Sequence, residues 1–399
     1  MKILLLCNKS PWPPKDGGAA ATLCMIMGLS ECQVPITVLA FNTLKHFTDT
    51  ADIPEEYINK VEFHFVNIDT RINPVRLILN LIFSDKPYSI ERFESAEFEE
   101  KLSGLLKNDF DIIQIEGLAL CHYLPLIRQK TTAKVVFRPH NIESRIWSQL
   151  ADEEKNPFRK SYFRILSKRI KRTETEIIND FDGVAAIAAN DLSWFKSNGL
   201  SKPSIVVLPG VVTQNLRGNV EIKSTSVFFI GALDWLPNIN GLRWFVKKVW
   251  PLVLKVIPGA SFSIAGRNAS GNIVRLLKGD NIFFHGEVLS STEFMNDKSV
   301  MIVPLFSGSG IRMRIIEGMS LGKSIVTTYR GAEGIDDENK RNIFIADSPE
   351  DFSDCIIELL KNTDLLKQTG KNAIENVRKN YNILASTKNL LKFYSELIA

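Results

Sequence analysis

The sequence is poor in the features that mark secreted or membrane-embedded proteins. An odd and scattered set of cysteines without a CxxC pair argues against a disulfide framework or a structural zinc site, and it is typical of a reducing compartment. These cysteines are Cys7, Cys24, Cys32, Cys121 and Cys355. No stretch approaches the roughly 18 apolar residues of a membrane-spanning helix.

The apolar run at the N-terminus, in MKILLLCNKSPWPP, is shorter than the core of a signal peptide, and no small-residue cleavage site follows it. We expect this run to form the first buried strand, and we expect a cytoplasmic protein. The net charge of +4 is too small to indicate nucleic-acid binding.

Two signatures of cofactor chemistry are missing as well. No GxGxxG motif follows the first expected strand, which disfavours a Rossmann dehydrogenase. No His, Asp and Glu cluster stands at metal-ligand spacing, so we expect neither a metal nor a cofactor.

Short β-rich runs alternate with amphipathic helical runs, which predicts βαβ units and parallel sheets. Strands are expected first at 2–7, 35–41, 61–66, 111–116, 133–138, 183–188 and 204–209. Residues 210–225 are polar and aperiodic, which is typical of a domain boundary. The alternation resumes with strands expected at 226–231, 261–266, 281–286, 300–305, 324–328 and 342–346, and 349–397 reads as consecutive helices.

This pattern predicts an α/β protein of two Rossmann-like, doubly wound domains that face a cleft. We place the domains at residues 1–215 and 216–382, with a terminal helix in 383–399 that packs back on the first domain. Open parallel sheets bind ligands beyond the carboxyl ends of their strands, and clefts between domains are common ligand sites. The residues that directly follow strands are therefore the candidates for chemistry.

The strongest candidate is the segment 304–335, PLFSGSGIRMRIIEGMSLGKSIVTTYRGAEGI. A loop containing Gly308, Ser309 and Gly310 follows an expected strand, and a helix is expected from near Ile311 to just before Gly322. Backbone amides of such a loop, together with a helix N-terminus, form a cradle for a phosphate group.

Charged residues in this helix support the same interpretation. Arg312 and Arg314 stand in the expected first turn, where a cation opposes the helix dipole unless an anion binds there. Glu317 follows Arg314 by three residues, so the alternative is an ordinary Arg–Glu pair on the helix surface.

Three further candidates follow other strands. Gly17 and Gly18 come after the first strand and allow close approach of a ligand, although a plain tight turn is the alternative. His140 follows the strand at 133–138, where a helix-capping role is the alternative. Glu333, in the segment GAEG, either borders a donor pocket or is a solvated turn residue.

Together these segments resemble family 4 of the retaining glycosyltransferases, which have the GT-B fold. The resemblance extends over essentially the whole chain. It includes the Gly-Gly loop, the His after a later strand, FDGVAAIAANDLSWF (181–195), VVLPGVV (206–212), FIGALDWLPNINGLRWFVKKVWPLV (229–253), GSGIRMRIIEGMSLG and GAEGI.

The resemblance implies transfer of a sugar from a nucleotide diphosphate donor to a glycan or lipid-linked acceptor, with retention, in cell-surface polysaccharide biosynthesis. It implies that Gly17 and Gly18 line the cleft near the donor phosphate and that His140 contacts the donor sugar. Glu317 would bind the ribose hydroxyls, and Glu333 would lie near the nucleotide or sugar. We assign His140, Arg312 and Glu317 to catalysis, and Gly17, Gly18, Gly308, Ser309, Gly310, Arg314 and Glu333 to donor binding.

The sequence departs from the family pattern at two places. The first Glu of the family's E-x7-E motif falls at Ser309, and the Arg and Lys that many members use for the diphosphate fall at Ala232 and Pro237. We infer that Arg312 or Arg314 neutralises the diphosphate, and we expect Arg312, nearer the loop, to be the contact. A nucleotide-sugar epimerase of the same fold and a catalytically weak nucleotide-sugar-binding protein are the alternative functions.

One stretch stands apart from these motifs. Residues 158–172, FRKSYFRILSKRIKR, place seven Lys and Arg among apolar residues. Either this helix packs on its own domain with a solvated basic face, or it contacts anionic lipid on the inner face of the plasma membrane.

Overall fold

The structure is a computed structural model that describes residues 1–211, 225–308, 310–335 and 339–399. The chain divides into two compact units. Unit 1 comprises Met1–Gly210 and Ile383–Ala399, and unit 2 comprises Val211–Asn382. The boundary that we expect between residues 215 and 216 lies outside the described residues.

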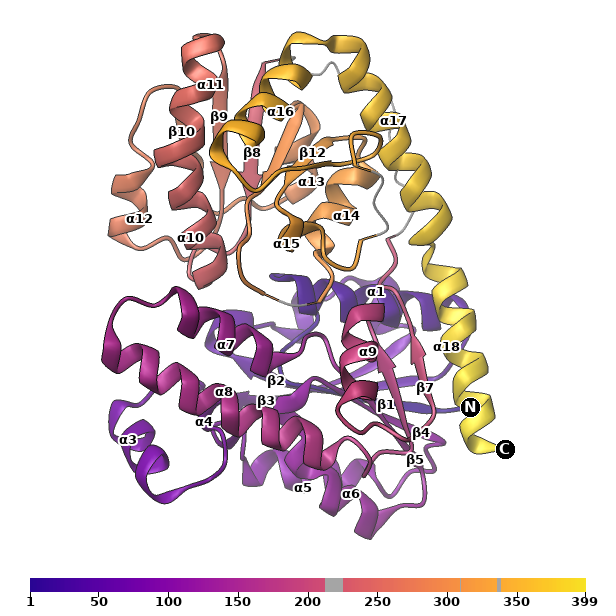
Figure 1. The fold of residues 1–399 in the computed structure, drawn as a ribbon. Coiled ribbons are helices and arrows are strands. Elements are labelled where there is room, and N and C mark those ends of the chain that lie inside the picture. Colours follow the sequence, from indigo (N-terminus) through magenta and orange to yellow (C-terminus); the bar gives the residue numbers. More distant parts are fainter. Residues whose placement is uncertain (212–224, 309, 336–338) are drawn as a thin grey trace. The chain divides into compact units, whose positions relative to one another are not determined.

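Unit 1 is built on a parallel sheet of seven strands in the order β3-β2-β1-β4-β5-β6-β7 (Figure 1). The strands are β1 (Ile3–Cys7), β2 (Ile36–Thr43), β3 (Val61–Ile68), β4 (Ile112–Glu116), β5 (Lys134–Arg138), β6 (Gly183–Ala186) and β7 (Ser204–Val206). Helices connect them: η1 (Leu44–His46), η2 (Thr50–Asp52), η3 (Leu118–Tyr123), α1 (Gly17–Glu31), α2 (Glu55–Ile58), α3 (Pro74–Phe83), α4 (Tyr88–Glu91), α5 (Ala96–Leu105), α6 (Leu124–Lys130), α7 (Glu143–Glu153), α8 (Pro157–Ile177) and α9 (Ala189–Ser197).

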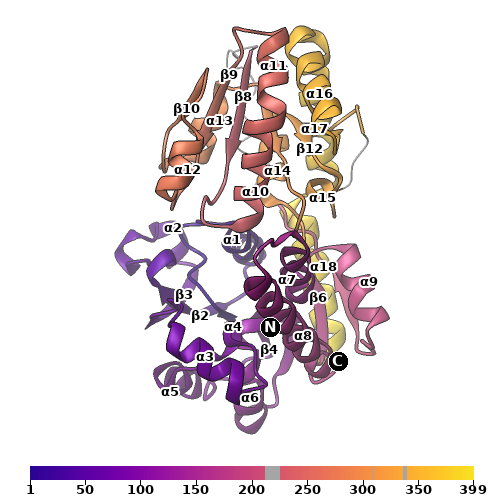
Figure 2. The ribbon, with the colours of Figure 1, turned by 60° about the vertical axis from the view of Figure 1, so that its left-hand side comes forward.

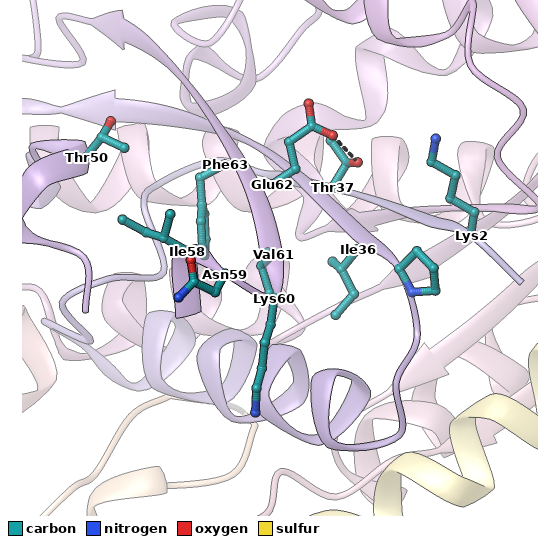
Figure 3. A pocket seen from close by; sticks show the side chains of 11 residues that line it. Lys2, Ile36, Thr37, Thr50, Ile58, Asn59, Lys60, Val61, Glu62 and Phe63 are labelled. Carbon is teal, nitrogen blue, oxygen red and sulfur yellow. Dashed lines mark hydrogen bonds between the residues drawn. The ribbon is translucent and has the colours of Figure 1, made fainter. Parts of the chain in front are cut away.

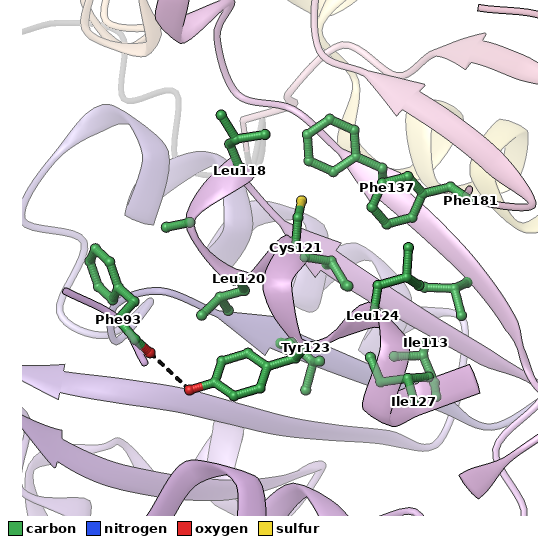
Figure 4. Close-up of a cluster of buried hydrophobic side chains, with 14 of the residues drawn as sticks. Phe93, Ile113, Leu118, Leu120, Cys121, Tyr123, Leu124, Ile127, Phe137 and Phe181 are labelled. Atoms are coloured by element: carbon green, nitrogen blue, oxygen red, sulfur yellow. Dashed lines mark hydrogen bonds between the residues drawn. The ribbon is translucent and has the colours of Figure 1, made fainter. Parts of the chain in front are cut away.

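The unit 1 sheet is buried on both faces, which explains why its central strands are continuous apolar runs. Along β1, Leu4 and Leu6 pack into a cluster with residues of α5, α6 and α8, whereas Ile3 and Leu5 pack into a second cluster with residues of α1. Figure 4 shows part of the first cluster, in which the Tyr123 hydroxyl donates to the carbonyl of Phe93 at 2.8 Å.

The last helix, α18 (Ile383–Ile398), belongs to unit 1 although every residue of unit 2 precedes it in the chain. Its Leu390 and Phe393 complete the second cluster against α1. Glycine permits this approach, because a Cβ added at Gly28 would lie 2.1 Å from Thr387 Oγ1. The Tyr394 hydroxyl donates to Gln114 of β4, which ties the helix to the middle of the sheet.

Unit 2 is a second α/β unit, with six parallel strands in the order β10-β9-β8-β11-β12-β13 (Figure 2). Its strands are β8 (Ser226–Ile230), β9 (Ser261–Ala265), β10 (Ile282–Phe284), β11 (Val300–Val303), β12 (Ser324–Thr327) and β13 (Phe344–Ile345). Its helices are α10 (Leu236–Trp244), the π-helical turn η5 (Phe245–Val249), α11 (Trp250–Val256), α12 (Gly271–Leu276), α13 (Ser291–Asn296), α14 (Met313–Ser320), α15 (Tyr329–Ala332), α16 (Pro349–Lys361) and α17 (Thr363–Asn380).

Two element boundaries differ from the sequence expectation. Gly17 and Gly18 open α1 rather than forming a separate loop, because the Asp16 side chain caps the helix by accepting from Ala19 N at 2.9 Å. The helix expected from near Ile311 begins at Met313. Gly308 and Gly310 have φ of 128° and 75°, values that keep the backbone out of a helix up to this point. Among the described residues, no helix is long and apolar enough to cross a membrane.

The contact between α18 and α1 makes a direct prediction about stability. Gly28→Ala should lower the melting temperature, because the added Cβ overlaps Thr387 Oγ1 and overpacking costs about 1–3 kcal/mol. Combining it with Thr387→Ala should recover part of that loss. As a control, a Cβ at Gly104 of α5 meets nothing within 4 Å, so Gly104→Ala should not destabilise. Equal melting of Gly28→Ala and wild type would contradict the described packing of α18.

Candidate functional site

The carboxyl edge of the unit 1 sheet carries a buried charged cluster. Glu116 ends β4 and Arg138 ends β5, and the two residues are partners in the register of these neighbouring strands. Both are only 1% exposed. His140 follows β5 by two residues, so chain direction and strand order bring it to the same edge.

The Glu116 carboxylate collects donors from several elements. Its Oε2 accepts from Arg138 Nη1 at 2.9 Å, from His140 Nε2 at 2.5 Å and from Thr22 Oγ1 of α1 at 3.0 Å. Its Oε1 accepts from the side-chain amide of Gln114, which in turn accepts from Tyr394. Buried carboxylates persist in proteins only when they are satisfied in this way.

The electrostatics of the cluster fix the protonation state of its carboxyl group. Burial alone would raise the pKa of Glu116, but Arg138, and then His140 and Thr22, lower it to about 2. Glu116 is therefore ionised near neutral pH and acts only as an acceptor. The Nε2 atom of His140 must then carry the proton of that hydrogen bond.

The other nitrogen of His140 faces the start of α1. A Cβ added at Gly18 would lie 3.0 Å from His140 Nδ1 and 3.2 Å from Lys9 Nζ. Glycine at this position thus leaves room for the imidazole ring and the ammonium group. The structure brings Gly18 and His140 together, as expected for residues of one site.

A second ionic group holds the N-terminus of α1. Asp16 accepts from Lys9 Nζ at 2.7 Å and contacts His46 Nε2 at 2.8 Å, while it also caps the helix. Burial would raise the pKa of Asp16, but Lys9 and then His46 hold it well below its ordinary value. The result is a fixed ammonium group of Lys9 beside Gly18.

In unit 2, the loop after β11 wraps around the Arg312 side chain. Arg312 is 9% exposed, and its Nη1 donates to the carbonyl of Gly310 at 3.1 Å. Gly308 has a φ of 128°, which residues with a Cβ rarely adopt, so glycine is favoured at this position beside the guanidinium group. Ser309 lies outside the described residues.

Two Arg–Glu pairs follow the adjacent strands β11 and β12. Arg314 Nη1 donates to Glu317 Oε2 at 2.6 Å, and both side chains are about a quarter exposed. Arg330 Nη1 donates to Glu333 Oε2 at 2.8 Å. The Arg314–Glu317 pair that the sequence left open as an alternative is present in the structure. Since this pair remains partly exposed, its two charges can exchange partners when a polar ligand binds.

The two loops that carry these pairs are held together by backbone and hydroxyl groups. Leu305 N donates to Thr328 Oγ1 at 3.2 Å, and the Thr328 hydroxyl donates to the carbonyl of Leu305. The predicted residues Gly308, Gly310, Arg312, Arg314, Glu317 and Glu333 therefore belong to two joined loops and their helices at the carboxyl edge of the unit 2 sheet.

Several site residues were not predicted from the sequence. Glu116, Arg138, Lys9 and His46 reach the unit 1 site without belonging to a recognised motif, and Arg330 lies in the segment 304–335 but was not assigned a role. One signal was available for two of them: a single charged residue ends each of the apolar strands IIQIE and KVVFR. A charged residue at the end of a buried strand must have a partner of opposite charge, so it indicates a buried ion pair.

Other polar features lie at the opposite edge of the unit 1 sheet. A hollow of about 520 Å³ is lined by residues that precede or open β1, β2 and β3, including Lys2, Ile36 and Glu62 (Figure 3). Two Asp-x-Asp triplets, at 109–111 and 180–182, precede β4 and β6. Among the residues that the structure describes, no three His, Cys, Asp or Glu side chains form a group that could hold a metal ion.

Residues 224–362 match a family model described as "Glycosyl transferases group 1". The matched segment contains Arg312, Arg314, Glu317 and Glu333. A protein of Klebsiella pneumoniae, described as an "Uncharacterized 44.6 kDa protein in cps region", is 24% identical over 95% of this chain and 96% of its own length. An uncharacterized glycosyltransferase of Methanocaldococcus jannaschii is 23% identical over 84% of this chain and 88% of its own.

Solved structures share the fold of the whole chain. The Anabaena protein HepE, in complex with UDP and glucose, matches with a TM-score of 0.69 at 14% identity over 99% of both chains. The sucrose-phosphate synthase of Thermosynechococcus elongatus matches with a TM-score of 0.72 at 13% identity, over 100% of this chain and 99% of its own. The fold is therefore GT-B, as the sequence predicts. With the matched family segment, these findings support a glycosyltransferase.

The close approach at Gly18 leads to a test of the unit 1 cluster. Gly18→Ala should displace the His140 ring, because the added Cβ lies 3.0 Å from Nδ1. We expect turnover of a sugar donor to fall at least tenfold, about 1.4 kcal/mol, while the melting temperature stays near that of wild type because alanine favours a helix. Gly104→Ala is the matched control. If the Gly18→Ala variant turns over the donor as fast as wild type, the orientation of His140 plays no part in sugar transfer.

The charges of α14 allow a second test. Glu317→Ala should weaken binding of both the free nucleotide and the nucleotide sugar, since losing a contact to a charged group costs about 1.5–3 kcal/mol. Arg312→Lys keeps the charge but loses the forked geometry and the buried contact to Gly310. It should depress turnover more than donor binding, because charge on the leaving diphosphate grows in the transition state. If folded variants at Arg312 and Arg314 all keep full turnover, this phosphate-site assignment is wrong.

Proposed function

We propose that this protein transfers a sugar from a nucleotide diphosphate donor to a glycan or lipid-linked acceptor, with retention of the anomeric configuration. The observation that carries the proposal is the location of Arg312, Arg314, Glu317 and Glu333. All four follow strands at the carboxyl edge of the unit 2 sheet, and all lie in the segment that matches the group 1 glycosyl transferases. This edge is where open parallel sheets bind ligands.

Similar structures support the choice of donor. HepE was solved with UDP and glucose, and another structure of the same protein contains UDP-glucose. By analogy, we propose that unit 2 binds the nucleotide, with Glu317 on the ribose hydroxyls and Arg312 on the diphosphate. Gly308, Ser309 and Gly310 would bring their backbone close to the phosphate groups. Cell-surface polysaccharide biosynthesis is the setting that the family resemblance implies.

The chemistry needs negative charge to be stabilised on the departing diphosphate. Fixed guanidinium groups can provide this stabilisation without a divalent cation, and Arg312 is held in place by its contact with Gly310. We therefore propose a metal-independent transferase. Because Arg and Lys are missing at Ala232 and Pro237, Arg312, the N-cap residue of α14, and Arg314 would be the main source of this charge.

Unit 1 would supply contacts to the sugar and the acceptor. His140 has one ring nitrogen fixed by Glu116 and the other directed toward Gly18. A ring held in this manner donates or accepts at a set position, which suits recognition of a sugar hydroxyl. Lys9 lies beside it with its charge paired to Asp16, so it adds an N–H donor at this position rather than a net positive charge.

A donor panel tests the proposal. UDP-, GDP- and ADP-sugars should be compared by thermal stabilisation, since a ligand at a hundred times its Kd adds about 2.7 kcal/mol to the stability of the folded state. The stabilising donor should then release its nucleoside diphosphate slowly with water as the acceptor. This release should survive EDTA, because no metal is needed to stabilise the leaving group.

Each alternative gives a distinct result. Conversion of the donor to an isomeric sugar without release of the nucleotide would identify an epimerase. Stabilisation by a donor with no turnover would identify a binding protein. Activity that is abolished by EDTA and restored by Mg²⁺ or Mn²⁺ would overturn the metal-independent mechanism.

A further inference from the structure

Helix α3 turns its apolar face away from the protein. Val75, Ile78, Leu79 and Ile82 follow the i, i+3, i+4, i+7 spacing of one helix face, and they are 66%, 54%, 49% and 65% exposed. Phe83, at the end of the helix, is 80% exposed. Single exposed apolar residues are common, but a contiguous group of this kind marks an interaction surface.

The opposite face of α3 is held by polar contacts. Asn80, the buried residue of the helix, donates to the carbonyl of Lys86 at 3.0 Å and to Glu91 Oε2 at 2.6 Å. Arg169 of α8 donates to the carbonyls of Asn80 and Leu81 at 3.2 Å and 2.9 Å. The helix is thus fixed with its apolar side outward.

Capping at the N-terminus of α3 supports the same orientation. The Asn73 side chain accepts from the amides of Val75 and Arg76 at 3.0 Å and 3.1 Å. The backbone N–H of Asn73 donates to the hydroxyl of Tyr88 at 3.1 Å. These contacts hold the inner face of α3 against unit 1, so the outward orientation of its apolar face belongs to the folded protein.

The helix next to α3, α8, carries exposed basic side chains. The contacts of Arg169 place α3 beside α8, and Figures 1 and 2 both show the two helices next to each other. In α8, Phe163, Leu166 and Ile170 are buried, and the last two belong to the first core cluster of unit 1, as one of the two sequence interpretations expects. What α8 presents outward is mainly charge.

Four cations of this surface are available to a partner. Arg76 on α3 and Arg164, Lys168 and Lys171 on α8 are exposed. None of the four forms an ion pair with any other residue that the structure describes. Of the nearby carboxylates, Asp69 pairs with Arg71, Glu94 pairs with Lys86, and Asp85 acts on Arg172 of α8 rather than on these four cations.

We propose that α3 and the outward face of α8 form a surface that binds anionic phospholipid bilayers, with α3 lying in the headgroup region. An apolar helix face bordered by unpaired cations matches the apolar interior and anionic surface of such a membrane. The ten residues of α3 span about 15 Å, which suits a helix parallel to the surface rather than one that crosses it. This surface is independent of the residues assigned to sugar transfer.

Sedimentation with vesicles tests the proposal on the full chain. We expect wild type to bind vesicles of phosphatidylcholine with phosphatidylglycerol, and to bind pure phosphatidylcholine at least tenfold more weakly. Ile78→Gln combined with Ile82→Gln should lower binding to the anionic vesicles at least tenfold, because two apolar anchors are lost. Charge reversal at Arg164, Lys168 and Lys171 should lower it at least as much, since each cation contributes about fivefold.

Controls separate this surface from general stickiness and from unfolding. Phe283 and Leu289 of unit 2 are exposed at 52% and 109%, so Phe283→Gln with Leu289→Gln is a matched apolar control that should bind like wild type. Melting temperatures should be unchanged in all variants, because the altered side chains are exposed. Wild-type vesicle binding by the Ile78 and Ile82 variant would overturn the proposal. So would a finding that these substitutions convert a dimer to a monomer while wild type ignores vesicles, which would assign the face to self-association.

Discussion

The buried carboxylate of Glu116 is the group on which unit 1 depends. A charge with 1% exposure is tolerated only where donors surround it, and here the donors come from different parts of the fold. Thr22 belongs to α1, Arg138 to β5 and His140 to the following loop. The contacts that satisfy the Glu116 charge therefore also orient the imidazole ring of His140. The same hydrogen bonds thus stabilise the core of unit 1 and position the candidate site.

Unit 2 prepares its site in a different way. The Arg314–Glu317 pair is partly exposed and within one helix, whereas the Arg312 side chain is buried and bonded to its loop. Partly exposed ion pairs contribute little to stability, so they can be exchanged for contacts to a ligand at small cost. Unit 1 thus contains a rigid, buried polar cluster. Unit 2 contains ion pairs in which a ligand can replace one of the two partners.

The βαβ alternation was sufficient to predict the fold class, because buried parallel strands are continuous apolar runs that helices separate. Each expected strand run overlaps a strand of the structure, and the GT-B prediction is confirmed. The start of α14 was misplaced because sequence periodicity does not reveal the positive φ of Gly308 and Gly310. The division of the chain near residue 215 and the roles of the site residues stay predictions.

The Glu116 cluster could not be found from the sequence, since it joins residues from β4, β5 and α1 that are distant in the chain. Its recognition requires the register that makes Glu116 and Arg138 neighbours. The outward face of α3 was also hidden. The spacing of Val75, Ile78 and Ile82 is identical to that of a core-facing helix, and only the contacts of Asn80 and Arg169 show which side faces inward.

The placement of α18 in unit 1 has a consequence for biosynthesis. A ribosome makes the seven strands of unit 1 first, then all of unit 2, and only afterwards Leu390, Phe393 and Tyr394. Until those residues emerge, the sheet face that α1 also covers lacks part of its cover, and Gln114, the neighbour of the Glu116 charge, lacks its tyrosine partner. Domains usually fold in the order in which they are translated. Here the contiguous unit 2 can reach its native packing while unit 1 still lacks α18, so that a chain interrupted before α18 contains every donor of the Glu116 carboxylate but not the tyrosine that bonds to Gln114.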